Sequence, residues 1–218
     1  MAPWNSPDEV GCTRRKPVIG LAGGIASGKS MVAEQLRRLG SAIVDSDQMV
    51  HEEIAKPDVV QTFKSWWGQK VVDSEGRINR QVMSEIIFGD AEQRKRMESF
   101  LYPRLERRRE KMMRGFEDDP AVRAIVIDSP LLFEVGLDRL CDAVIFTECD
   151  RDVRVGRARE SRGWTESEFD RREMLQKSLD MKARMADYRV VNNSTIDALL
   201  AQVTPLFERL IEAQASSR

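Results

Sequence analysis

The sequence contains few of the residues that many enzymes use for catalysis and metal binding. It has one histidine, His51, and three cysteines, Cys12, Cys141 and Cys149. A single histidine argues against a histidine-rich metal site and a Ser-His-Asp hydrolase. The cysteines lack the CxxC spacing of zinc sites and the density of a disulfide scaffold. This cysteine usage fits a protein of the reducing cytosol, so we expect a cytoplasmic location.

Long apolar runs and an excess of one charge are also missing. No stretch reaches the 18 or more apolar residues that span a bilayer, so we expect no membrane partner. The 35 basic and 36 acidic residues nearly cancel, so the chain lacks the overall positive field of many nucleic-acid binders. We therefore expect no nucleic-acid partner.

The first 16 residues, MAPWNSPDEVGCTRRK, lack the uninterrupted apolar segment of a secretory signal peptide. Their proline, charged and small residues are typical of a chain end without a packed core. We expect residues 1–16 to form a disordered leader outside the fold.

Short apolar runs alternate with amphipathic segments in the rest of the chain. This pattern predicts an α/β fold in which a parallel five-stranded sheet is sandwiched by helices. The expected strands are brief and rich in valine and isoleucine, as buried parallel strands are. They lie at 18–22, 42–45, 124–128, 143–147 and 188–191.

Two segments interrupt this alternation. Residues 48–116 predict several helices, one of them starting at an Asp90-x-x-Gln93 capping box, and residues 157–186 are strongly charged and restart at Thr165-x-x-Glu168. We interpret the first segment as an acceptor-side insertion and the second as a lid. The nucleotide-binding core then comprises the segments 17–47, 117–156 and 187–214, and a final amphipathic helix follows Ser194 as its N-cap.

One local motif identifies a ligand. The stretch from Gly23 to Ser30, GGIASGKS, satisfies G-x-x-x-x-G-K-[ST] between a predicted strand and a predicted helix, as a phosphate-binding loop requires. Glycines let successive N–H groups surround an anion, and the helix N-terminus adds its dipole. Lys29 can reach the β- and γ-phosphates, and the Ser30 hydroxyl can join the shell of a Mg²⁺ ion. We expect a nucleoside triphosphate to be bound by Gly24, Ile25, Ala26, Ser27, Gly28, Lys29, Ser30 and Met31.

Two carboxylates follow the second predicted strand, in the stretch IVDSD. Because alternate residues of an extended chain face the same way, Asp45 and Asp47 can both point to the sheet edge where ligands bind. One of them can take the proton from an acceptor hydroxyl. The alternative is that Asp47 caps the helix that begins near Gln48, and the two roles can coexist.

A phosphate-binding loop by itself does not separate kinases, ATPases and GTPases. The Asn-Lys-x-Asp motif with which GTPases bind the base is absent, and the D-x-x-G match at Asp73–Gly76 lies in the inserted region. Two classes remain open from the residues: a kinase for a small acceptor such as a nucleoside or nucleotide, and a nucleotide-dependent switch.

Taken together, five stretches resemble the dephospho-CoA kinase family. They are AGGIASGKS, VDSD, DSPLLFE at Asp128–Glu134, Arg157 followed by a lid that ends in Gln176, and ADYRVVNNST. The resemblance runs from about Val18 to Phe207. It implies a core, a helical CoA-side domain and a lid, and transfer of the ATP γ-phosphate to the ribose 3′-hydroxyl of dephospho-CoA. That reaction gives CoA and ADP and is the last step of CoA biosynthesis.

The resemblance also implies roles for individual residues. Lys29 neutralises phosphate charge, Asp47 is the base for the 3′-hydroxyl, and Asp45 lies near the metal, so that Ser30 and Asp45 are the metal candidates. Arg157 corresponds to the lid-side arginine that stabilises the transferring phosphoryl group. Asn192 matches the asparagine near the adenine end. ATP, Mg²⁺ and dephospho-CoA are the implied ligands; the chain is expected to be a monomer or a small homo-oligomer.

Smaller features complete this interpretation. Arg172 and Gln176 match the lid pattern, whereas two positions depart from the family, with Ala22 in place of threonine and Tyr102-Pro103 in place of His-Pro. We interpret RLERRREKMMR, residues 104–114, as a solvated helix face whose arginines pair with glutamates of the same helix.

Overall fold

The computed structural model describes residues 16–174 and 176–216. Its centre is an all-parallel five-stranded sheet in the order β2-β3-β1-β4-β5. The strands are β1 (Val18–Gly23), β2 (Ser41–Asp45), β3 (Ala124–Asp128), β4 (Ala143–Glu148) and β5 (Tyr188–Val191). All five predicted strands are confirmed, and so is the α/β fold class. The predicted leader lies outside the described residues, apart from Lys16.

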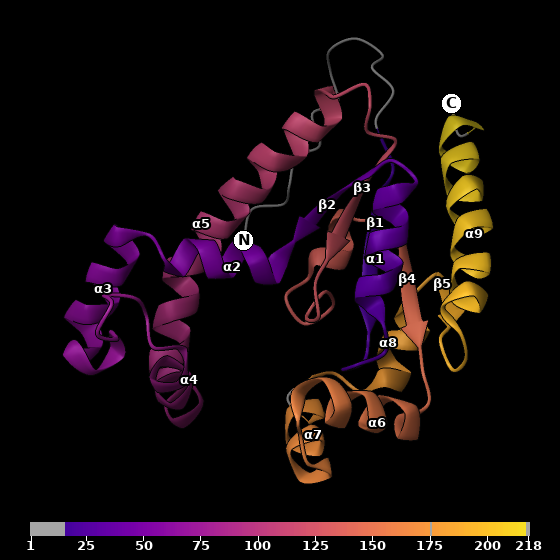
Figure 1. Ribbon diagram of the computed structural model, residues 1–218. Helices are drawn as coiled ribbons and strands as arrows, with labels where there is room; N and C mark the ends of the chain where they lie inside the picture. The colour runs from indigo at the N-terminus through magenta and orange to yellow at the C-terminus, as the bar shows by residue number, and fades with distance from the viewer. Residues whose placement is uncertain (1–15, 175, 217–218) are drawn as a thin grey trace.

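Helices cover both faces of the sheet (Figure 1). On one face, α1 (Lys29–Arg38) and α9 (Ile196–Ser216) pack on the strands through a buried cluster that includes Leu36, Val203 and Phe207. On the other face lie part of α5 (Ala91–Asp118), η2 (Leu137–Leu140) and α8 (Leu179–Met185). Burial on both faces explains why the strands are almost uniformly apolar.

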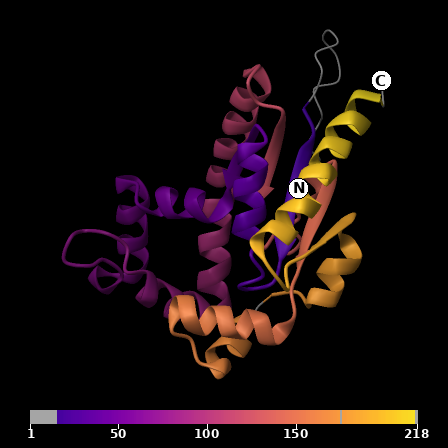
Figure 2. The same ribbon diagram turned by 45° about the vertical axis from the view of Figure 1, so that its right-hand side comes forward.

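The helical segment between β2 and β3 has an apolar core of its own. It consists of α2 (Ser46–Ile54), α3 (Pro57–Trp67), η1 (Gln69–Val71), α4 (Arg80–Gly89) and the long α5. Phe63, Trp67 and Leu101 are buried together in a cluster that none of the strand residues joins. In Figures 1 and 2, α3 and α4 lie to one side of the sheet, and α5 runs from them back to β3. This arrangement supports the prediction of an inserted helical region.

The cap predicted for α5 is half correct. The Asp90 carboxylate accepts the N–H groups of Glu92 and Gln93, as predicted. The reciprocal half of the capping box is wrong, because the Gln93 Oε1 atom accepts a hydrogen bond from Trp67 Nε1 at 2.8 Å. Gln93 therefore joins α5 to α3 instead of closing its own helix end.

The cap predicted for α9 is displaced by one residue. The Thr195 hydroxyl, not that of Ser194, accepts the N–H of Ala198 at 3.3 Å. The hydrophobic face predicted for α9 is otherwise confirmed, although Ile196 is 55% exposed and stays outside the core.

The arginines of α5 find partners on other helices. Arg104 pairs with Glu53 and Asp58, each at 2.7 Å, and Arg108 pairs with Glu52. Within the 104–114 stretch, Arg114 pairs with Glu110 of the same helix at 3.9 Å. The prediction of a solvated face held by pairs within the helix is thus wrong for Arg104 and Arg108, which fasten α5 to α2 and α3.

The second charged segment, residues 157–186, contains the end of α6 (Arg151–Arg162), α7 (Glu166–Glu173) and α8. Helices α6 and α7 lie beneath the ends of the strands in Figures 1 and 2. The Thr165–Glu168 capping box is confirmed, and Gly163 ends α6 with a left-handed φ of 67°. Helix α6 begins at Arg151, before the predicted start of the lid at residue 157. Helix α8 lies inside the predicted lid range, 157–186, but packs on the core strands β1 and β4. The division into domains remains a prediction. Nowhere in the described ranges is there a helix with the length and apolarity to cross a bilayer.

Candidate active site

Most of the predicted site residues, together with Asp128, come from the carboxyl ends of the strands. The phosphate-binding loop follows β1, Asp45 ends β2, Asp128 ends β3, and Asn192 follows β5. In a parallel sheet these ends share one edge, and ligands of open α/β sheets bind there. The topology therefore brings together segments that are far apart in the sequence.

The phosphate-binding loop presents unused backbone donors. The N–H groups of Ser27 and Met31 are taken by the carbonyls of Gly24 and Gly28, at 3.1 and 2.9 Å. Within the described part of the chain, five other N–H groups of the loop donate to no acceptor, those of Ile25, Ala26, Gly28, Lys29 and Ser30. Free N–H groups at a loop and helix N-terminus form an anion site. The Met31 side chain instead packs against the core.

Asn192 fixes the shape of this loop. Its Nδ2 atom donates to the Ser27 carbonyl at 2.7 Å, and the side chain is buried. Gly28 has a φ of 92°, and a Cβ at this position would lie 2.1 Å from Asn192 Nδ2. Glycine is therefore required at 28 for both backbone conformation and space. Contact of Asn192 with adenine remains a prediction, because the structure shows its amide in use by the loop.

The Lys29 ammonium is held at the same edge by an ion pair with Asp128, across 99 residues of sequence. Both side chains are largely buried, with 16% and 12% exposed. Asp128, absent from the predicted site residues, thus positions the phosphate-binding lysine. Its place at the end of a predicted strand, as the first residue of DSPLLFE, was the available signal. In the structure Asp128 pairs in register with Asp45.

Asp45 and Asp47 have different structural roles. Asp45 is the N-cap of α2, and its Oδ1 accepts the N–H of Gln48 at 2.9 Å. Asp47 lies inside the first turn of the same helix. The alternative in which Asp47 caps the helix is therefore wrong, and its carboxylate is available for other interactions.

The environment of the Asp47 carboxyl raises its pKa. Burial of the carboxyl is the largest cause. Lys29 acts in the opposite direction, and the charges of Asp45 and Asp128 add to the rise. The residue as a whole is nonetheless exposed to solvent. A carboxylate that is partly desolvated yet accessible is suited to accept a proton.

Arg157 also lies close to the phosphate-binding loop. From α6 its guanidinium reaches Asn192 Oδ1 at 3.5 Å and Cys149 Sγ at 3.4 Å. A Cβ on Gly28 would lie 3.9 Å from Arg157 Nη1. The structure therefore places this predicted residue against the loop, although its catalytic role remains a prediction.

A second arginine of α6 was missed by the sequence interpretation. Arg154 is buried, donates to the Cys149 carbonyl at 3.0 Å and pairs with Glu173 of α7. Its Nη1 atom would lie 3.0 Å from a Cβ on Gly24. Its spacing of three residues from Arg157, on one helix face, was the only signal for it.

The two other residues predicted for the lid, Arg172 and Gln176, contact different parts of the structure. The Arg172 guanidinium lies 4.2 Å from the Trp164 ring centroid within the lid itself. Gln176 instead accepts a hydrogen bond from Lys182 at 3.0 Å. Of the two, the structure connects Gln176 to the core.

The oxygen atoms at the sheet edge suit a Mg²⁺ ion. The Ser30 hydroxyl is exposed at the start of α1, and Asp45 keeps one carboxylate oxygen beyond its cap bond. No group of three or more histidine, cysteine or acidic residues in the described ranges is placed to hold a metal. Hard oxygen donors in small number match the way Mg²⁺ is bound with substrate phosphates.

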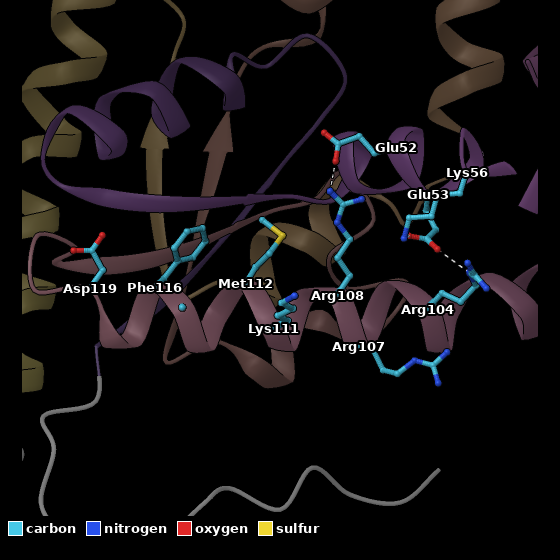
Figure 3. Close-up of a pocket in the computed structure, with 11 residues that line it drawn as sticks. Glu52, Glu53, Lys56, Arg104, Arg107, Arg108, Lys111, Met112, Phe116 and Asp119 are labelled. Atoms are coloured by element: carbon cyan, nitrogen blue, oxygen red, sulfur yellow. Dashed lines mark hydrogen bonds and ion pairs between the residues drawn. The ribbon is translucent and has the colours of Figure 1, made fainter. Parts of the chain in front are cut away.

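A large groove lies elsewhere, between α2 and α5 (Figure 3). Its volume is about 1160 Å³, and Glu52, Glu53, Arg104 and Arg108 are among the residues that line it. At about 100° per residue, Glu52 and Glu53 lie on the side of α2 away from Asp47. In Figure 3, Glu52 points to Arg108 and Glu53 to Arg104. The groove is therefore not part of the site built around the phosphate-binding loop.

The two departures from the family pattern lie in different places. Ala22 is buried within strand β1, paired in register with Phe146 of β4. Tyr102 is 47% exposed on α5, where burial of its hydroxyl and the nearby Glu98 raise its pKa. Ala22 therefore offers no group to the loop.

Comparison with known proteins identifies the relatives of this chain. The family model described as Dephospho-CoA kinase matches residues 17–198. The dephospho-CoA kinase of Symbiobacterium thermophilum is 36% identical over 85% of this chain and 78% of its own length. That of Corynebacterium glutamicum is 34% identical over 88% of this chain and 96% of its own length.

A solved structure shows the same fold. The crystal structure of a Thermus thermophilus protein is 24% identical, covers 90% of this chain and 98% of its own, and superposes with a TM-score of 0.77.

Proposed function

This chain belongs to the dephospho-CoA kinase family, and from that membership we propose that its phosphate-binding loop and Asp47 transfer the ATP γ-phosphate to dephospho-CoA. The acceptor is the ribose 3′-hydroxyl, and the products are CoA and ADP. The observation that carries the proposal is the meeting of free loop N–H groups, Lys29 and the Asp47 carboxylate at one sheet edge. Such a site can hold a triphosphate and activate an alcohol beside it.

The loop and its lysine act on the phosphates. Free N–H groups between Ile25 and Ser30 bind the β-phosphate, and Lys29 neutralises charge that develops between the β- and γ-phosphates. Asp128 holds the ammonium near that position, and Asn192 maintains the loop conformation. Little reorganisation is then needed when the nucleotide binds.

Asp47 acts on the acceptor. Its carboxylate takes the proton of the 3′-hydroxyl while that oxygen forms a bond to the γ-phosphorus. The bond between the γ-phosphorus and the bridging oxygen breaks, and ADP leaves with the bond's electron pair. The raised pKa of Asp47 brings its basicity nearer to neutral pH, which favours proton transfer.

Mg²⁺ is proposed as the metal, with Ser30 and Asp45 as its protein oxygen donors. When bound, it would neutralise negative charge on the β- and γ-phosphates. We also propose a cytoplasmic location and a monomer or small homo-oligomer; neither nucleic acid nor a membrane is proposed as a partner.

Replacing Arg157 by alanine is expected to lower kcat by about a hundredfold, because one donor to the developing phosphoryl charge is removed. The measurement is steady-state CoA formation at saturating ATP. Arg159 on the same helix is exposed, so Arg159→Ala is the matched control and should keep kcat. Equal activity of the two variants would assign Arg157 to loop packing alone.

A substrate panel tests the function itself. The purified protein is incubated with ATP and Mg²⁺, and ADP is measured with dephospho-CoA, nucleosides, nucleotides or no acceptor, while CoA is identified by mass. The proposal expects ADP release to require dephospho-CoA and to match CoA formation one to one. Preference for a nucleoside or nucleotide would point to another small-molecule kinase, and slow hydrolysis without an acceptor would point to a nucleotide-dependent switch.

A further inference from the structure

A lysine is buried where the lid returns to the core. Lys182 of α8 is 1% exposed, and its ammonium lies among three oxygen atoms. It donates to the Pro130 carbonyl at 2.9 Å and to Gln176 Oε1 at 3.0 Å, and it pairs with Glu134 Oε1 at 3.0 Å. A buried ammonium is costly unless its protons are satisfied, so this set of acceptors is what allows a charge here.

The Glu134 carboxylate also binds the returning backbone. Its Oε1 accepts the N–H of Lys177 at 2.8 Å, and Lys177 Nζ donates to the Phe133 carbonyl at 3.2 Å. Glu134 belongs to the loop that follows Asp128, the last residue of β3 and the partner of Lys29. The segment 176–182 is thereby tied to the loop next to the residue that positions the phosphate-binding lysine.

The same segment contacts the phosphate-binding loop. Leu179, at the start of α8, would lie 3.0 Å from a Cβ on Gly24, as would Arg154 Nη1. Arg154 in turn pairs with Glu173, the last residue of α7. The lid is therefore attached on both sides of its C-terminal turn: at Glu173 through Arg154, and at Gln176 through Lys182.

We infer that Lys182 and Glu134 are positioning residues for phosphoryl transfer. They fix the segment 176–182, which we call the C-terminal hinge of the α6–α7 lid, against the loop that follows Asp128. This inference rests on the proposed function, because its main test measures CoA formation. With the hinge fixed, α6 and α7 hold Arg154 and Arg157 against the phosphate-binding loop in one position. A shifted hinge leaves the site less protected from water, so that ATP is hydrolysed instead of being transferred.

The positioning role of the Lys182–Glu134 pair can be tested apart from its effect on stability, because of how buried ion pairs contribute to the free energy of unfolding. Removing one partner leaves an uncompensated buried charge and strongly destabilises a protein, whereas replacing both partners is often neutral. The pair is thus poor evidence for stability, and a role in position can be tested by removing both charges together.

The experiment compares Lys182→Met, Glu134→Gln and the double variant Glu134→Gln/Lys182→Met. Thermal melting, kcat and the ratio of ATP consumed to CoA formed are measured for each. We expect both single variants to melt well below the parent protein and the double variant to recover most of the melting temperature. The double variant should still have at least a tenfold lower kcat and a raised ATP-to-CoA ratio. Recovery of kcat and of the ratio together with melting would overturn the inference.

Glu134→Asp provides a second test if the charge-removing variants fail to fold. It keeps the charge and shortens the side chain, so it moves the hinge without leaving Lys182 unpaired. We expect a near-parental melting temperature with a several-fold lower kcat and a higher ATP-to-CoA ratio. Unchanged values of both would contradict a positioning role.

A readout without acceptor separates this inference from the proposed function. Trypsin cleavage after Arg162, Arg171 or Arg172 is followed with and without a non-hydrolysable ATP analogue. The analogue should protect the lid of the parent protein and should protect that of Glu134→Asp less. If the parent protein makes no CoA but its lid is protected more than that of Glu134→Asp, the proposed function is wrong and the inferred role of the hinge is retained. Equal protection in both proteins rejects the hinge.

Discussion

Replacing Asp47 by asparagine is expected to lower kcat by about a hundred- to ten-thousandfold, which is the usual contribution of a general base. ATP affinity should stay near the parental value, because Asp47 contributes no bond to the phosphate-binding loop. The measurements are kcat for CoA formation and equilibrium binding of an ATP analogue. A parental kcat in Asp47→Asn would remove this residue from the role of base.

Glu52→Gln is the matched control for Asp47→Asn. Glu52 lies on the opposite side of the same helix, where its partner is the partly exposed Arg108. Loss of an exposed ion pair costs about 1 kcal/mol or less, so the control should keep its activity. A loss of similar size in both variants would indicate damage to α2 instead of removal of a base.

The pH dependence of the parental enzyme follows from the raised pKa of Asp47. The base works only when ionised, so kcat/KM should fall as the pH drops through this pKa. The fall should begin at a higher pH than an ordinary aspartate, with a pKa of about 3.9, would give. The residual kcat/KM of Asp47→Asn should not show this fall at acidic pH. Since the folded protein holds this proton more tightly than the unfolded chain, ionising Asp47 lowers stability as the pH rises.

Replacing Gly28 by alanine is expected to disrupt nucleotide binding and to lower stability. A Cβ would lie 2.1 Å from Asn192 Nδ2, so the hydrogen bond from Asn192 to the Ser27 carbonyl must break or shift. Leaving a buried polar group unsatisfied costs about 1–3 kcal/mol, and the left-handed conformation adds about 1–2 kcal/mol. A total of about 2–5 kcal/mol corresponds to a fall of about 5–15 °C in melting temperature for a chain of this size.

The same energy reduces the population of the competent loop by a factor of roughly 30 to several thousand, and ATP affinity should fall accordingly. Gly163→Ala is the control, because Gly163 also has a positive φ, of 67°, but nothing lies within 4 Å of its Cβ position. This control should lose about 1 kcal/mol of stability from conformation alone and keep its ATP affinity. Similar ATP affinity in the two variants would show that Asn192 does not hold the loop.

The phosphate-binding loop could be predicted because all the residues that define it lie in one short stretch of sequence. Glycines, a lysine and a serine at fixed spacing, between an apolar run and a helix, require no distant partner to be recognised. The five strands were equally accessible, since a strand buried on both faces must be apolar along its length. The family resemblance added the acceptor, and the comparisons support it.

Predictions that depended on partners failed more often. Gln93 bonds to Trp67 instead of closing its own capping box, and Arg104 pairs with Glu53 and Asp58 from other helices. Local spacing identifies which partners are within reach on one helix, but it does not report competing partners that packing brings closer.

The sequence by itself determined the apolar strands and the loop that binds phosphate, because both follow from the order of neighbouring residues. Only the tertiary structure decided that Asp45 caps α2 while Asp47 stays available, that Lys29 rests on Asp128, and that Asn192 holds Ser27 across 165 residues of chain. These contacts depend on the strand order β2-β3-β1-β4-β5 and on the rotation of each helix about its axis. Both are set by the packing of the whole core, which no short stretch of sequence encodes.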